Sequence, residues 1–131
     1  MESNFDKVVE FNQLVLGVEP RAKGLQSREE MLLSVAQLKE EIAEYIEAHT
    51  KSDYIGAVDA CIDSLYFTYG VLYKLGLNAK QVDEIFDIVH CANMRKRKGV
   101  KEGREGFGGA ADATKPEGWE SPEDAIARAL K

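Results

Sequence analysis

The chain has 131 residues, 44% of them hydrophobic, and a formal net charge of −6 at pH 7. Its length suits one domain with one modest core, and its acidic balance excludes a general nucleic-acid binder, which would carry a basic surplus. Residues 1–10 carry four charges and no long apolar run, and no stretch reaches the ~20 apolar residues of a membrane span. We therefore expect a cytoplasmic protein with no nucleic-acid or membrane partner.

Periodicity and boundary residues predict two helices in the N-terminal half. The first is amphipathic and runs from Asn4 to about Leu16. Ser27 is a suitable N-cap, and Glu30 three residues later completes a capping box, so a second helix begins there and runs to about His49. Its apolar residues recur in steps of three and four, at Val35, Leu38, Ile42 and Tyr45.

A third helix, from about Asp53 to Leu75, has the most regular pattern in the chain and ends before Gly76. Its apolar residues form a seam typical of a helical bundle: Ile55, Val58, Ile62, Leu65, Tyr69 and Leu72. Asn78 then caps a fourth helix that reaches about Arg97. We expect this helix to bury Val82, Ile85, Phe86 and Val89, and we expect both cysteines, Cys61 and Cys91, to be buried free thiols.

The composition changes after Lys98. Residues 99–118 contain six glycines and few apolar residues, which is typical of a mobile loop, and a short terminal helix follows from Pro122 to about Leu130. No segment has the pattern of a β-strand. The sequence thus predicts an all-α, antiparallel four-helix bundle-like domain over residues 1–98, with residues 99–131 as its flexible Gly-rich loop and C-terminal tail.

Two groups of carboxylates lie on consecutive predicted helices. Glu41 and Glu44 are three residues apart, and Asp59 and Asp63 are four apart, so each pair shares one face of its helix. Carboxylates that converge in a packed core repel one another and lose hydration, so they need a cation between them. All-oxygen ligands suit Mg²⁺. Spacing alone leaves a shared metal site and ordinary surface charge as alternatives.

Several short motifs, in order, resemble those of a known family. They are Glu40-Glu41-x-x-Glu44, Asp59-x-x-x-Asp63-x-x-Tyr66, Val89-His90-x-x-Asn93-Met94-x-Lys96 and Lys115-Pro116-x-Gly118-Trp119-x-x-Pro122. The chain resembles the all-α nucleoside triphosphate pyrophosphohydrolases, which include MazG-like proteins, dimeric dUTPases and phosphoribosyl-ATP pyrophosphohydrolases. Its closing motif is similar to the small, often phage-encoded branch that is phosphoribosyl-ATP-pyrophosphohydrolase-like. One position departs from the family pattern: Ala60 stands where the family usually has glutamate, and Asp59 is the nearest substitute.

The resemblance implies cleavage of a nucleoside triphosphate between the α- and β-phosphates, which yields the monophosphate and diphosphate and serves nucleotide-pool control. It implies Mg²⁺, with Mn²⁺ as a substitute, held by Glu41, Glu44, Asp59 and Asp63. Glu40 or Glu41 would orient or deprotonate the attacking water. Asn93 and Lys96 would contact the phosphates or sugar, and Asn12 would lie near the nucleobase, with a purine such as (d)GTP as the preferred base.

Alternatives remain open at several points. The substrate of the second enzyme hypothesis is phosphoribosyl-ATP, and the non-enzymatic hypothesis is a helical module that binds metal or nucleotide. Asn12 has an alternative as a plain surface residue, and Trp119 either stacks on a base or pins the tail to the bundle. The resemblance also implies a homodimer or homotetramer, in the cytoplasm of a bacterium or phage-infected host cell.

Overall fold

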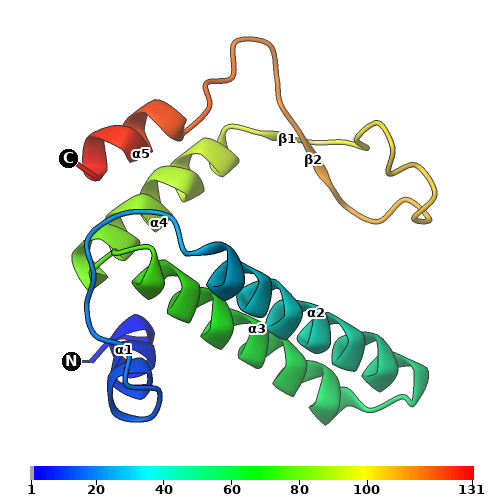
Figure 1. Ribbon diagram of the computed structural model, residues 1–131. Helices are drawn as coiled ribbons and strands as arrows, with labels where there is room; N and C mark the ends of the chain where they lie inside the picture. Colours follow the sequence, from blue (N-terminus) through cyan, green and yellow to red (C-terminus); the bar gives the residue numbers. More distant parts are fainter. Residues whose placement is uncertain (1) are drawn as a thin grey trace. The chain divides into compact units, whose positions relative to one another are not determined.

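The computed structural model describes residues 2–131. Along the sequence, the chain divides into two compact units, with the boundary between residues 79 and 80. The first unit contains α1 (Asn4–Leu14), α2 (Arg28–Thr50) and α3 (Tyr54–Lys74) (Figure 1). The second contains nearly all of α4 (Ala79–Met94), then β1 (Arg97–Lys98), β2 (Ala113–Thr114) and α5 (Glu123–Ala129). The all-α class is confirmed. The boundary that the sequence predicts at residue 98 stays a prediction.

In the first unit, α2 and α3 form an antiparallel hairpin and α1 packs on α3 (Figure 1). Asp53 caps α3 by accepting a hydrogen bond from the Gly56 N–H at 2.9 Å. Ser27 caps α2 as predicted, accepting from the Glu30 N–H at 3.2 Å. The Glu30 carboxylate, which was predicted to complete a capping box, instead binds Arg21 at 2.7 Å, which ties the α1–α2 connection to the first turn of α2.

The end of α3 depends on Gly76, whose φ of +91° lies in the left-handed region. Its N–H donates to the Tyr73 carbonyl at 3.0 Å, and the Leu77 N–H donates to the Leu72 carbonyl at 3.2 Å. A Cβ at this position would lie 2.6 Å from the backbone of Ala22 and Lys23. The predicted stop is therefore confirmed, and it also allows the α1–α2 connection to pass close to the helix end.

The buried positions of the hairpin differ from the predicted seams. Apart from Tyr73, they are small or polar: Ser34, Glu41 and Ala48 on α2, and Ala60 and Gly70 on α3. Small side chains let two helices approach closely, and the larger apolar side chains then lie on the outer side of the contact. Ile55, for example, is 79% exposed. Most of the predicted bundle seam is therefore exposed in the single chain, and only Leu38, Tyr69 and Leu72 of it are half-buried.

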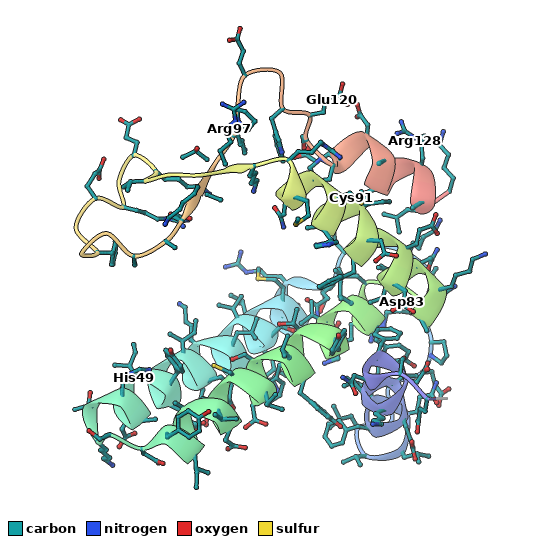
Figure 2. All side chains as sticks on the ribbon, turned by 180° about the vertical axis from the view of Figure 1, so that it is seen from behind. His49, Asp83, Cys91, Arg97, Glu120 and Arg128 are labelled. Atoms are coloured by element: carbon teal, nitrogen blue, oxygen red, sulfur yellow. The ribbon has the colours of Figure 1, made fainter. Side chains whose placement is uncertain are left out.

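The hairpin consequently presents an apolar face, formed by Ile42, Tyr45, Val58, Ile62 and Leu65, all of which are exposed. At the end of the hairpin near His49, this face is hollowed into an open cavity. Figure 2 shows His49 beside the turn. By length and composition alone, α3 would suffice to cross a membrane, which for one helix is weak support for such a role. This helix is an exception to the expectation that no stretch of the chain is long and apolar enough to span a membrane.

In the second unit, α4 ends at Met94, before the predicted Arg97, because Arg97 and Lys98 pair with Thr114 and Ala113 in an antiparallel ladder. This two-residue pair corrects the expectation that the chain has no strand. Val82 is buried as predicted, whereas Phe86 is 70% exposed and Val89 is also exposed. Both cysteines are free but exposed, so their predicted burial is wrong.

Candidate metal centre

The α2–α3 hairpin brings three carboxylates together. Glu41 and Glu44 lie one turn apart on α2, and Asp63 faces them from α3. One oxygen from each side chain lies within 4.8 Å of the other two. Glu41 is 7% exposed, Asp63 is half-buried and Glu44 is exposed, so the acidic cluster Glu41–Glu44–Asp63 has a buried floor and an open side.

The electrostatics of the cluster are unfavourable without a cation. Burial, followed by a hydrogen bond shared with Glu44 and by the charges of Glu44, Asp63 and Glu40, raises the pKa of the Glu41 carboxyl to about 7. Glu41 Oε2 is buried with no hydrogen-bond partner. Within the described residues 2–131, no lysine, arginine or histidine forms an ion pair with any of the three. A proton or a cation must therefore relieve the repulsion.

The ligand set fits a hard divalent cation. All three groups offer carboxylate oxygens, with no thiol or imidazole among them, and this favours Mg²⁺ over zinc. The unpartnered oxygen of Glu41 is available for coordination. The exposed side at Glu44 leaves room for the waters and substrate oxygens that Mg²⁺ usually retains.

Two other predicted carboxylates lie outside the cluster. Glu40 is exposed, and it acts on Glu41 only through its charge. Asp59 is exposed and is not part of the three-carboxylate group found among the described residues. Ala60 is 1% exposed and lines the same hollow as Glu41. A methyl group thus stands beside the cluster at the position of the family's usual glutamate, and the metal role of Asp59 stays a prediction.

Asn12 is buried on α1, 3% exposed, which excludes the alternative that it is a plain surface residue. Its amide Nδ2 donates to the Val8 carbonyl at 2.9 Å, and Gly70 on α3 lets it approach closely. Its Oδ1 has no hydrogen-bond partner. Ser34 from α2 and Tyr66 from α3 line the small cavity of about 30 Å³ beside it. That volume admits a water molecule but not a nucleobase without movement of α1.

The predicted phosphate-binding residues lie in the second unit, near the end of α4. Asn93 is exposed, and its carbonyl accepts the Lys96 N–H at 3.0 Å. The Lys96 ammonium lies 5.2 Å from the centroid of the Trp119 ring. Trp119 Nε1 donates to the Ala92 carbonyl at 2.8 Å, so Trp119 pins the tail to α4, as one of the two alternatives predicted.

Lys115 is a residue to which the sequence assigned no role. Its ammonium lies 5.0 Å from the centroid of the same Trp119 ring. Lys115 and Lys96 are far apart along the chain, and no periodic pattern relates them. The only signal that pointed to this segment was the closing motif that contains Lys115 and Trp119.

A comparison with known proteins agrees with these features. The sequence profile of the family described as phosphoribosyl-ATP pyrophosphohydrolase matches residues 13–93. This range covers the acidic cluster, α2, α3 and most of α4, and it ends at Asn93. No curated protein matches the chain significantly.

Proposed function

Because the chain belongs to the phosphoribosyl-ATP pyrophosphohydrolase family, we propose that it is a Mg²⁺-dependent nucleoside triphosphate pyrophosphohydrolase that converts a (d)NTP and water into the (d)NMP and diphosphate. Family membership supports hydrolysis of a pyrophosphate bond. The single observation that carries the metal dependence is the acidic cluster Glu41–Glu44–Asp63, with its buried and unpartnered Glu41 oxygen.

In this proposal Glu41, Glu44 and Asp63 hold Mg²⁺, or Mn²⁺ in its place. A triphosphate carries several negative charges, so carboxylates can bind it only through a divalent cation. The bound ion supplies charge neutralisation and a water of lowered pKa. Glu41 and Asp63 come from different helices, so the rigid hairpin holds the ligand oxygens in place before substrate arrives.

Glu40 or Glu41 is the candidate to take up the proton of the attacking water. Glu41 would accept the proton through the carboxylate oxygen that does not bind the ion, because its pKa of about 7 belongs to the metal-free cluster and a bound cation lowers it. Glu40 is exposed next to the cluster and is free to orient a water from outside it. Glu40→Gln separates the two roles, because it leaves the three-carboxylate group intact. Loss of turnover with unchanged Mg²⁺ binding would assign the proton transfer to Glu40.

For substrate binding, we assign Asn93 and Lys96 to the phosphates or sugar and Asn12 to the nucleobase. The unpartnered Asn12 Oδ1 supports its role, because an unpaired acceptor at a buried position is costly and can accept a donor of the base. A purine such as that of (d)GTP carries such donors. The same assignment requires α1 to shift, because the cavity at Asn12 is small.

The deciding experiment incubates the protein with each common (d)NTP and with phosphoribosyl-ATP, in the presence of Mg²⁺, and identifies the products by chromatography. Monophosphate plus diphosphate from a (d)NTP supports the proposal, and turnover of phosphoribosyl-ATP alone supports the phosphoribosyl-ATP pyrophosphohydrolase alternative. Absence of turnover would favour a non-catalytic module.

Glu41→Gln and Asp63→Asn should abolish activity, whereas Glu47→Gln, an exposed glutamate on the same helix, is the matched control. Asp59→Asn should leave Mg²⁺ affinity nearly unchanged if Asp59 is not a ligand.

We also propose that the protein acts in the cytoplasm as a homodimer or homotetramer. The support is the apolar face of the hairpin, since large contiguous apolar patches on a soluble protein mark association surfaces. A second copy of the same face would cover it with two-fold symmetry. Sedimentation velocity at several concentrations tests this assembly, and a monomer throughout would refute it.

A further inference from the structure

Three features of the second unit place Lys96 and Lys115 against the same tryptophan ring. The first is the strand register: Arg97 pairs with Thr114 at the end of the two-residue ladder, so Lys96 and Lys115 flank that end, one residue beyond it on each strand. The second is a turn, in which the Trp119 N–H donates to the Pro116 carbonyl at 3.1 Å and Gly118 has a φ of +77°. Such a turn needs glycine at its third position, and it sets Lys115 close to Trp119.

The third feature is the bond from Trp119 Nε1 to the Ala92 carbonyl, at 2.8 Å. It fixes the indole on the last turn of α4, which ends two residues before Lys96. The two ammonium groups then lie 5.2 and 5.0 Å from the centroid of one ring. The register, the turn and the indole bond are separate constraints, and all three lead to the same pair.

The pair is electrostatically incomplete. Two ammonium groups near one ring repel each other, and contact with the indole offsets this only in part. Within residues 2–131 neither lysine forms an ion pair with a carboxylate. Arg95, Arg97 and Lys98 add further positive charge nearby. An anion with charge spread over several oxygens would bind both ammonium groups at once and remove their repulsion.

We propose that Lys96 and Lys115 form a two-lysine clamp that binds the polyphosphate of the substrate or its diphosphate product. Lys115 is then a further substrate-binding residue, and Trp119 is the positioning residue whose ring both ammonium groups contact. The inference rests on the proposed function, since that function supplies the polyphosphate. Residues 80–131 contain ten lysines and arginines against ten aspartates and glutamates, and such a balanced surface favours a small polyanion over nucleic acid.

The chain provides its own probe, because Trp119 is its only tryptophan. We would titrate the full-length protein, free of divalent metal, with inorganic pyrophosphate and follow Trp119 fluorescence, with potassium chloride at matched ionic strength as the reference. The clamp predicts a saturable change with pyrophosphate only. Lys115→Gln should weaken binding by about tenfold or more, as expected for loss of one charge-assisted contact. Lys131→Gln, which removes a lysine of the same unit, should leave it unchanged.

Trp119 is tested separately by calorimetry, because its replacement removes the fluorescence signal. Trp119→Phe keeps an aromatic ring but loses the Nε1 donor, so pyrophosphate binding should weaken, and the double variant with Lys115→Gln should bind no worse than the weaker single variant. That lack of additivity identifies a shared site, and a purely structural role would instead give additive losses. In turnover, Lys115→Gln should raise KM by about tenfold with little change in kcat.

Several outcomes would overturn the clamp. They are unchanged pyrophosphate affinity in Lys115→Gln, an equal loss in Lys131→Gln, additive losses with Trp119→Phe, and saturation by a single-stranded oligonucleotide but not by pyrophosphate. Failure of the clamp can be told apart from failure of the proposed function. Full turnover of a nucleoside triphosphate by Lys115→Gln with unchanged KM would refute the clamp alone. Lys115-dependent pyrophosphate binding without turnover of any nucleotide would support the clamp and refute the hydrolase.

Discussion

Replacing Glu41 with glutamine should make the metal-free protein more stable at alkaline pH. The pKa of Glu41 is raised from its ordinary value of 4.5 to about 7, chiefly by burial and then by Glu44 and Asp63. A carboxyl with a raised folded-state pKa favours folding while it is protonated. Its contribution is complete below about pH 4.5 and is lost as the pH rises through 7. Glutamine keeps the shape of the protonated group and cannot ionise.

The size of the effect follows from the same shift. A pKa that rises from 4.5 to about 7 corresponds to a loss of at most about 3 kcal/mol of folding stability above pH 8. Water reaches the cluster along the exposed Glu44 side, which screens part of the repulsion. We therefore expect the free energy of unfolding of Glu41→Gln to be larger than that of the wild type by about 1–2 kcal/mol at pH 8. Near pH 5 the two values should be equal.

Urea denaturation between pH 5 and 8 in metal-free buffer measures this difference. Subtraction of the Glu41→Gln curve from the wild-type curve removes the titration of all other groups. Glu47→Gln is the control, because the Glu47 carboxylate is exposed and pairs with Lys51 at 2.6 Å. Added Mg²⁺ should stabilise the wild type at pH 8 but not Glu41→Gln. Parallel curves for the wild type and Glu41→Gln across this range would refute the reasoning, as would a less stable Glu41→Gln at pH 8.

Three further outcomes follow from the structure. Mg²⁺ affinity should fall about tenfold for each pH unit below 7, because the ion must displace the Glu41 proton. Calorimetry in two buffers of different ionisation enthalpy should detect the released proton as a difference in binding heat. Equal heats in the two buffers would contradict proton release. Gly76→Ala should lower the urea stability by about 2 kcal/mol or more, since φ is +91° and a Cβ would contact Ala22 and Lys23; an unchanged midpoint would contradict the contact. Ile62→Lys on the apolar face should shift sedimentation toward the monomer, with exposed Lys51→Gln as control, and an unchanged assembly would exclude that face.

Much of the helical fold and the acidic cluster could be predicted from the sequence. Periodicity over more than ten residues is a strong signal, so each long helix was found within a few residues of its bounds. The cluster could be predicted because Glu41 and Glu44 share one face at three-residue spacing and Asp63 lies on the helix that returns beside them. Local spacing and one short hairpin turn are sufficient for that convergence.

The burial of each helix face could not be predicted in the same way. A pattern such as Ile55, Val58 and Ile62 shows which side chains favour burial, but it does not say whether the same chain or another copy covers them. In the structure the small residues Ala48 and Ala60 occupy the contact between α2 and α3. Close approach of two helices competes with burial of large side chains, and the close approach prevails here within the single chain.

The pairing of β1 with β2 could not be predicted because two residues are too short for any strand pattern. The proximity of Lys96 and Lys115 depends on that pairing and on the bond from Trp119 to Ala92. Both are long-range in sequence. In the sequence, only the order of motifs in the tail pointed to Lys115 and Trp119. The order of motifs does not show how far apart two residues lie in space.

Ala60 links the fold of the hairpin to the proposed chemistry. A methyl group at this buried position leaves three carboxylates in the cluster, where a glutamate would add a fourth. Three carboxylates repel one another less than four, so the metal-free hairpin is less strained, but in the proposed site they would hold Mg²⁺ with one ligand fewer. We therefore expect the ion to depend more heavily on oxygens from the triphosphate itself. Metal and nucleotide would then bind cooperatively, and the substrate would complete the site that cleaves it.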